Sequence, residues 1–157
     1  MHYPLDVMKI RPFQFGKYDP VSNSFGKVRV HHTRAHQGWD LLAAPGTPVY
    51  AIAGGDLTSR ASSSYGNIAT LKFRYKGKTY YAFYAHLSVV TGANSCVLEG
   101  SVIGKTGMTG NARKIPVPEA HLHFEIRTKA SPGNHSGLHD RIDPGDVLGY
   151  SVYSCSA

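Results

Sequence analysis

Two histidines, His121 and His123, lie one residue apart within the apolar stretch AHLHFEI. Alternate residues of a β-strand point to the same face, so both imidazoles are expected on one side, roughly 7 Å apart. That spacing is too long for both to bind one metal ion unless the strand bends, but it suits a shared cavity. The pattern indicates that one histidine ligates a metal while the other acts on a substrate. A half-exposed strand with two ordinary histidines is the alternative.

A carboxylate and a further histidine–aspartate pair extend this pattern. Glu125 continues the alternation and could accept a hydrogen bond from a ligating histidine, although a solvent-facing glutamate fits equally well. His36 and Asp40, in HQGWD, have an even spacing that an extended segment would turn to one side. A surface histidine and a turn aspartate beside a core Trp39 are the alternative for this pair.

Histidine and aspartate together suit a catalytic zinc site, which keeps three protein ligands and one open position. Cobalt or manganese could substitute in an imidazole and carboxylate set. Cys96 and Cys155 form no Cys-x-x-Cys pair, so a structural zinc knuckle is not expected. His86, in FYAHLS, has no informative neighbours and gains its weight from the other histidines. These residues predict a metal hydrolase.

Six segments give this chain a family resemblance, and they follow one another in the order HQGWD, APGTPVYAIAGG, YGN, YAHLS, GSVIGKTGMTG and HLHFEIR. From about Phe25 to Asp143 the chain resembles the lysostaphin-like (LytM-type) zinc peptidases of bacterial cell walls. The resemblance implies a compact antiparallel β-sandwich with a groove bounded by loops, and cleavage of peptide bonds in peptidoglycan. It implies one Zn²⁺ held by His36, Asp40 and His123, with His86 and His121 as the catalytic histidines.

The chain departs from the family pattern in three places. The segment NARKIPVPEA is longer than the usual short Gly/Ser-rich link before His-x-His, and the loop PGNHSGLHDR looks expanded. Both loops are expected to border the groove and to influence substrate choice. The tyrosine that some members place before the first ligand is not evident, and Tyr65 or Tyr84 could take its part.

Glycines and alternating apolar residues predict an all-β protein, either a β-sandwich or an open barrel, with long loops bounding a substrate groove. Strands are expected at 49–53, in IATLKFRYKG, in KTYYAFYAHLS after a turn at Gly77, and in HLHFEIRT. Loops are expected at NARKIPVPEA and from 131 to 150. The 157 residues suit one domain spanning 1–157, with an irregular segment 1–26, a family-like core at about 25–143 and a tail at 144–157.

The formal net charge of +7 favours an anionic partner such as a wall polymer, a membrane surface or nucleic acid. Because the basic residues are dispersed and not interleaved with aromatic residues, nucleic acid is not expected. No membrane span is expected, since there is no apolar run of about 18 residues. The first residues also lack a signal-peptide pattern.

The leading hypothesis is a zinc endopeptidase that hydrolyses peptidoglycan cross-links, outside the cell or in the periplasm, as a lytic enzyme or a delivered antibacterial toxin. A toxin implies an immunity or inhibitor protein at the groove, and a monomer is expected. The alternative is a non-catalytic peptidoglycan-binding or hydrolase-activating module on the same fold. Cys96 and Cys155 could form a disulfide or remain two free thiols. His135 and His139 could form a second metal site or lie in a solvated loop.

Overall fold

The computed structural model describes residues 1–133 and 136–150, and most of its regular structure is a nine-stranded antiparallel sheet. The strands of this sheet are β5 (Trp39–Leu42), β6 (Pro48–Tyr50), β7 (Gly55–Ser62), β8 (Gly66–Tyr75), β9 (Lys78–Val90), β10 (Ser95–Val97), β11 (Val102–Thr106), β12 (His121–Arg127) and β13 (Arg141–Ile142). Two hairpins stand apart from it, β1 (Phe13–Gln14) with β2 (Lys17–Tyr18) and β3 (Gly26–Arg29) with β4 (Arg34–His36). The predicted all-β class is confirmed.

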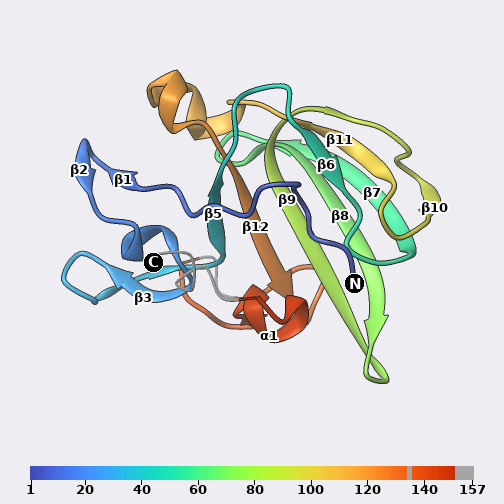
Figure 1. The fold of residues 1–157 in the computed structure, drawn as a ribbon. Coiled ribbons are helices and arrows are strands. Elements are labelled where there is room, and N and C mark those ends of the chain that lie inside the picture. Colours follow the sequence, from blue (N-terminus) through green and yellow to red (C-terminus); the bar gives the residue numbers. More distant parts are fainter. Residues whose placement is uncertain (134–135, 151–157) are drawn as a thin grey trace.

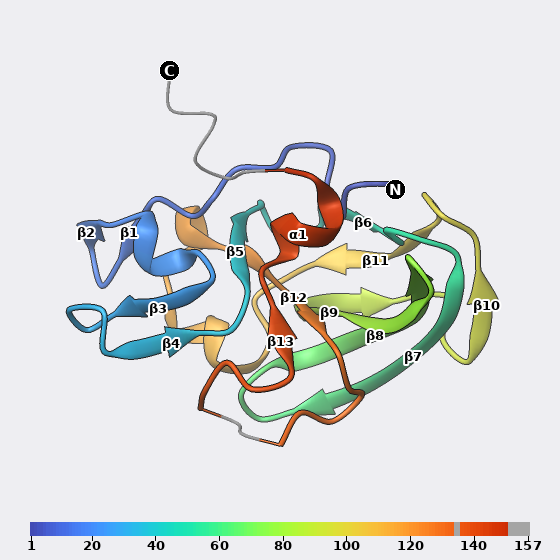
Figure 2. The same cartoon turned by 90° about the horizontal axis from the view of Figure 1, so that it is seen from below.

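The sheet branches along one edge of β9. Residues 81–85 of β9 pair with β12, whereas the stretch from Leu87 to Val90 pairs with β11. His86 lies at the change of partner, with a left-handed φ of 61° and its backbone N–H donated to Tyr65 O. Beyond this point β12 and β5 turn away from β11 and β6 (Figures 1 and 2). The branching opens the sheet beside His86.

The core follows the alternation that the sequence predicts for β8 and β9. In β8, Ile68, Leu71 and Phe73 are buried while Lys72 and Arg74 are exposed. All seven residues of β12 are buried, because its polar side chains are covered by neighbouring segments. The main apolar cluster reaches from Leu5 and Met8 near the N-terminus to Val147 and Leu148 in the C-terminal helix.

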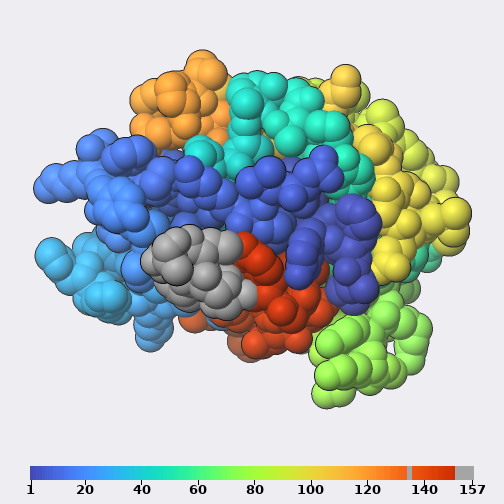
Figure 3. All heavy atoms as spheres, viewed as in Figure 1, coloured from blue at the N-terminus to red at the C-terminus, as the bar shows by residue number. Residues whose placement is uncertain are grey.

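The N-terminal segment is more organised than the predicted irregular region 1–26. It contains the β1–β2 hairpin and the 3₁₀ helix η1 (Val21–Asn23), and it lies along the outer edge of β5. Arg11 N–H donates to Asp40 O at 2.8 Å, and Leu42 N–H donates to Lys9 O at 2.7 Å. In the space-filling view this segment crosses the surface between the β5–β6 region and the C-terminal helix (Figure 3).

Three expected boundaries were wrong, each for a local reason. The predicted strand 49–53 is Pro48–Tyr50, because Ala51 and Ile52 instead bond to the N-terminus and the 100–101 turn. The predicted loop NARKIPVPEA contains 3₁₀ helices, η2 (Gly110–Lys114) and η3 (Val117–Glu119). The predicted loop 131–150 contains β13 and helix α1 (Pro144–Leu148), which begins where the Asp143 side chain accepts the Gly145 N–H.

In the part of the chain that the structure describes, no helix is long and apolar enough to span a membrane. Cys96 is exposed on β10. Its predicted partner Cys155, and His135 of the predicted second metal pair, lie outside the described residues. The disulfide and the second site therefore stay predictions. His139 is exposed, with its Nε2 3.5 Å from the Asp140 carboxylate.

Candidate metal centre

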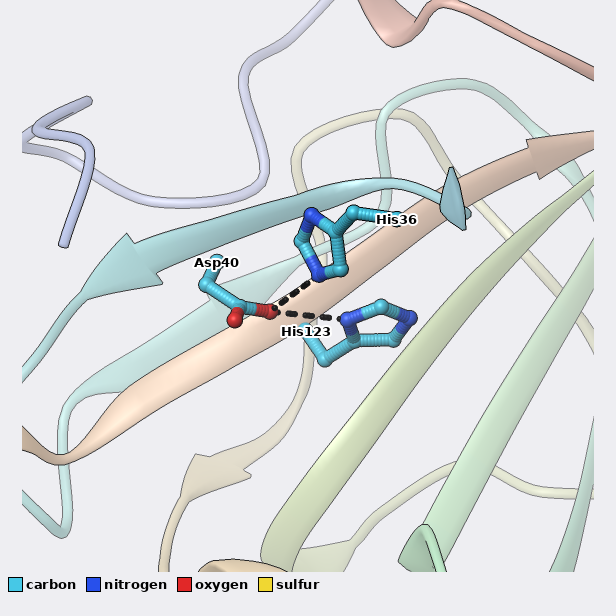
Figure 4. Close-up of side chains that lie close together, drawn as sticks. All are labelled: His36, Asp40 and His123. Atoms are coloured by element: carbon cyan, nitrogen blue, oxygen red, sulfur yellow. Dashed lines mark hydrogen bonds and ion pairs between the residues drawn. The ribbon is translucent and has the colours of Figure 1, made fainter. Parts of the chain in front are cut away.

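His36, Asp40 and His123 meet around one carboxylate oxygen (Figure 4). The pairing of β12 with β5 sets His123 directly opposite Asp40, and His36 ends the neighbouring β4. Asp40 Oδ1 lies 3.2 Å from His36 Nε2 and 2.8 Å from His123 Nδ1. One ligand atom from each residue lies within 4.8 Å of the others, and all three residues are buried. The structure thus brings together the three residues predicted to hold zinc.

Outer hydrogen bonds determine which imidazole nitrogen faces the cluster. His36 Nδ1 donates to the backbone O of Ser24 at 2.8 Å, which leaves Nε2 toward Asp40. His123 Nε2 donates to Glu125 Oε1 at 2.8 Å, which leaves Nδ1 toward Asp40. Ligating histidines in metalloproteins are oriented in this way by a carbonyl or carboxylate behind them. The donor set and its supporting bonds therefore fit a zinc ion.

Asp40 is ionised and positioned by two cations on its other oxygen. Arg29 Nη2 lies 3.1 Å from Asp40 Oδ2, and Arg11 Nη1 lies 3.9 Å away. Burial favours the protonated acid, but electrostatic attraction to the His36 and His121 imidazoles and hydrogen bonds from His123 and His36 hold the pKa of Asp40 well below its usual range. The two arginines keep Oδ2 turned away from the cluster and leave Oδ1 for a metal.

His86 and His121 lie beside this cluster, with ring centroids 5.3 Å apart. Their Nδ1 atoms donate to backbone oxygens, that of His86 to Thr109 O at 2.8 Å and that of His121 to Glu119 O at 3.1 Å. Burial lowers the pKa of both histidines, that of His86 to about 4. Both rings are therefore neutral at pH 7, each with an unprotonated Nε2. His121 Nε2 lies 3.8 Å from Asp40 Oδ1.

Burial favours the neutral form of His123, but its hydrogen bonds to Asp40 and Glu125 outweigh this effect and raise its pKa to about 9. Glu125 is fully buried and accepts from His123, which is the supporting role that the sequence left open. Its other oxygen accepts from Arg127 Nε at 2.6 Å and from Arg141 Nε at 3.2 Å. These contacts overcome the effect of burial and lower the pKa of Glu125 to about 2.

Of the two tyrosines considered as replacements, only Tyr65 lies at the site. Its ring stacks on His123 with centroids 5.5 Å apart, and its hydroxyl donates to Gln37 Oε1 at 2.9 Å. Tyr84 is fully buried in the core, where its oxygen accepts the Ile52 N–H.

Sequence reasoning missed Arg11, Arg29 and Thr109 as supporting residues. Arg29 was counted only among the dispersed basic residues, and nothing in the sequence near Arg11 indicates a contact with Asp40. The long segment NARKIPVPEA contacts the site as expected, since Glu119 holds His121 through its carbonyl and Arg11 through its carboxylate at 3.2 Å. In the second long loop, Gly137 O accepts from Gln37 Nε2.

Comparison with known proteins gives a family match across the site. The model of Peptidase family M23 matches residues 34–135. The DD-carboxypeptidase/endopeptidase Mpg of Neisseria meningitidis is 38% identical over 122 residues, 74% of this chain and 26% of that protein. The peptidoglycan DD-endopeptidase ShyC of Vibrio cholerae is 35% identical over 113 residues, 68% of this chain and 24% of that protein. The chain thus spans about a quarter of the length of these curated relatives.

The fold resembles that of a solved peptidase. The catalytic domain of lysostaphin from Staphylococcus simulans superimposes with a TM-score of 0.63 at 26% sequence identity. The match covers 81% of this chain and 90% of that domain. The resemblance inferred from the sequence segments is confirmed.

Proposed function

Because the chain belongs to peptidase family M23, we propose that it is a zinc-dependent endopeptidase that hydrolyses peptide cross-links of peptidoglycan. The relatives named as peptidoglycan endopeptidases support this substrate class. The observation that carries the proposal is the convergence of His36, Asp40 and His123 from three strands around one carboxylate oxygen. A substrate in the wall implies action outside the cell or in the periplasm.

We propose His36 Nε2, Asp40 Oδ1 and His123 Nδ1 as the zinc ligands. Bound zinc supplies Lewis-acid polarisation of a carbonyl and lowers the pKa of water to near 7. Ser24 and Glu125 keep the two imidazoles oriented, and Arg29 keeps the carboxylate oriented. Two neutral imidazoles and one carboxylate leave a divalent site at net +1, which favours an anionic tetrahedral intermediate.

His86 and His121 are the proposed proton-handling groups. Each has an Nε2 that its Nδ1 hydrogen bond leaves unprotonated, so either ring can accept a proton from water during attack. The resulting imidazolium can donate a hydrogen bond to the oxyanion and then protonate the leaving amine. Tyr65, stacked on His123, borders the same space.

The test is incubation of the protein with purified sacculi of Gram-negative and Gram-positive bacteria, followed by mass analysis of the released fragments. We expect new amino groups, loss of release with a chelator, recovery with zinc, and no release by His123→Ala. Absence of new amino groups from every type of sacculus, with one zinc bound per chain, would refute the proposal.

A non-catalytic wall-binding module would instead bind sacculi without cleaving them and without stoichiometric zinc, so metal analysis separates the two functions. We further propose that the protein is delivered as an antibacterial toxin and that an immunity protein binds at its groove. Expression of the protein in the periplasm of a host bacterium tests toxicity through cell lysis, and co-purification from a protected strain tests for an inhibitor. Sedimentation of the protein tests the proposed monomer.

A further inference from the structure

A cavity of about 110 Å³ lies beside the candidate metal centre, with Tyr65 between the two. Arg60 of β7, Arg127 of β12 and Arg141 of β13 line it, together with Tyr65 and the segment 130–132. None of these arginines belongs to the proposed metal site. Tyr65 connects the two places, because its ring stacks on His123 and also lines this cavity.

The charges around the cavity do not balance. Glu125 is the carboxylate that Arg127 and Arg141 share, and its other oxygen is occupied by His123. Among residues 1–133 and 136–150, the three guanidinium groups and this one carboxylate leave a surplus of positive charge. The nearby Asp140 does not compensate for it, because it accepts from Gly133 N–H and pairs with Lys129 at 3.8 Å.

Arg127 has an unused hydrogen-bonding edge. Its side chain is 5% exposed, its Nε is bound to Glu125, and its guanidinium carbon stacks 3.6 Å from the centroid of the Phe83 ring. Within residues 1–133 and 136–150, its Nη1 and Nη2 atoms have no hydrogen-bond partner, and neither is sealed from solvent. Arg60 is exposed and likewise has no partner among those residues.

We propose that this cavity is a carboxylate-binding subsite, and that it takes a free carboxylate of the peptide substrate. The fixed fork of a guanidinium matches a carboxylate through two parallel N–H donors, which the open edge of Arg127 offers. Arg60 of β7 adds a second cation to the lining. The volume accommodates a group of a few heavy atoms, since one water occupies about 30 Å³ in the liquid. The subsite would select peptides by charge and fix their register beside His123.

This inference rests on the proposed function, so the experiment uses two substrates that differ at the carboxylate alone. One is a synthetic cross-linked stem peptide with free carboxylates, and the other carries primary carboxamides in their place. We expect the zinc-loaded protein to cleave the acid with about tenfold higher kcat/KM than the amide. Equal kcat/KM for the two peptides would overturn the proposal.

Arg60 offers the cleanest variant, because it is exposed and does not support Glu125. Arg60→Ala should raise KM for the acid peptide several-fold, Arg60→Glu should raise it further, and Arg60→Lys should retain part of the selectivity. Values for the amide peptide should not change. Arg74→Ala, an exposed arginine at the β8–β9 hairpin, is the matched control and should leave both peptides unaffected. A parallel loss on both peptides with Arg60→Ala would contradict the subsite.

A binding measurement separates failure of this inference from failure of the proposed function. The uncross-linked stem peptide, in acid and in amide form, is titrated into isotope-labelled protein without reference to cleavage. The acid form should shift the backbone amide signals of Ala130 and Ser131 and the Nε signal of Arg127, and the carboxamide form should not. If neither cross-linked peptide is cleaved but the acid produces these shifts, the subsite stands and the proposed activity fails. No shift with either form overturns the subsite.

Discussion

Three of the four site histidines leave Nε2 free for chemistry, and the fourth, His123, leaves Nδ1. Ser24 accepts from His36 Nδ1 and leaves Nε2 toward Asp40. Glu125 accepts from His123 Nε2 and leaves Nδ1 toward Asp40. His86 and His121 both donate through Nδ1 to backbone carbonyls. Hydrogen bonding to Asp40, which His36 and His123 make, therefore divides the cluster of imidazoles into two candidate ligands and two candidate proton carriers.

This division predicts two classes of variant. His86→Ala and His121→Ala should bind one zinc per chain and lose activity by roughly 10²–10⁴-fold, the usual loss on removal of a general acid or base. His36→Ala and His123→Ala should lose zinc as well as activity. Measurement of bound zinc and of kcat for each variant checks these expectations. A His86→Ala protein that binds no zinc would contradict the assignment of His86 as a proton carrier.

Glu125 should control zinc affinity without touching the metal. Glu125→Gln removes the charge behind His123 and leaves Arg127 and Arg141 short of a counter-ion, so zinc affinity should fall about 10–100-fold. Competition with a chromogenic chelator measures it. Glu99→Gln is the control, because that carboxylate pairs with the amino group of Met1 and not with a group at the site. Equal affinity of Glu125→Gln and wild type would refute this role.

At the scale of elements, the site exists because the sheet divides at His86. Pairing with β12 ends at Ala85 and pairing with β11 begins at Leu87, and the imidazole of His86 lies 5.3 Å from that of His121, measured between ring centroids. The neighbouring segments hold it there, because Tyr65 O accepts its backbone N–H and Thr109 O accepts its Nδ1–H. Gly66 follows Tyr65, and an added Cβ there would lie 2.2 Å from Thr109 Oγ1.

Gly66 and Gly77 form a matched pair for testing this contact. Both have a left-handed φ, of 68° and 77°, but the space at Gly77 is open. Alanine at either position costs about 1–2 kcal/mol of backbone strain. Gly66→Ala should in addition displace Thr109 and lower kcat at least tenfold, whereas Gly77→Ala should keep the wild-type kcat. Thermal unfolding and peptide cleavage check both variants, and unchanged kcat in Gly66→Ala would contradict the argument.

The sequence predicts the elements whose side chains alternate, and it misses those held by long-range backbone contacts. The β8–β9 hairpin and β12 follow from periodicity and the turn at Gly77. The attachment of the N-terminal segment to β5 carries no such pattern, and so Arg11 could not be placed against Asp40. The spacing of His121 and His123 predicts one metal ligand and one histidine that acts on the substrate, but the family resemblance decides which is which. The role of His86 also comes from the resemblance, because an isolated histidine has no spacing to interpret.

At the scale of the whole molecule, the chain carries charged and titratable groups in its interior, supported from several segments. Asp40 forms ion pairs with Arg29 of β3, with Arg11 of the N-terminal segment and with His123 of β12. Glu125 receives Arg127 and Arg141. Folding must therefore bring distant segments together before these charges are compensated, and stability should depend on their protonation. We propose that 1–157 forms one domain for this reason, since segments from both ends contribute to one core.

The zinc-free protein should lose stability as pH rises from about 6.5 to 9. The pKa of His123 is raised from 6.5 to about 9, so the folded state holds this proton more tightly than the unfolded chain. The protonated His123 contributes fully to the free energy of unfolding below pH 6.5, and this contribution is lost as pH passes through 9, a change on the order of a few kcal/mol. His86 acts in a separate window. Its pKa is lowered to about 4, so its neutral form favours folding, and stability falls as pH drops from 6.5 toward 4.

Zinc should abolish the alkaline loss, because a ligating His123 Nδ1 carries no proton whose release destabilises the fold. Thermal unfolding from pH 4 to 9, with a chelator and with zinc, measures the loss of stability at alkaline pH and the loss at acidic pH. In the zinc-free protein, His123→Gln should remove the loss of stability at alkaline pH and keep the loss at acidic pH. Equal unfolding temperatures of the chelated wild type at pH 6.5 and pH 9 would show that His123 is not held by Asp40 and Glu125. The candidate ligand would then have to be oriented by the metal alone.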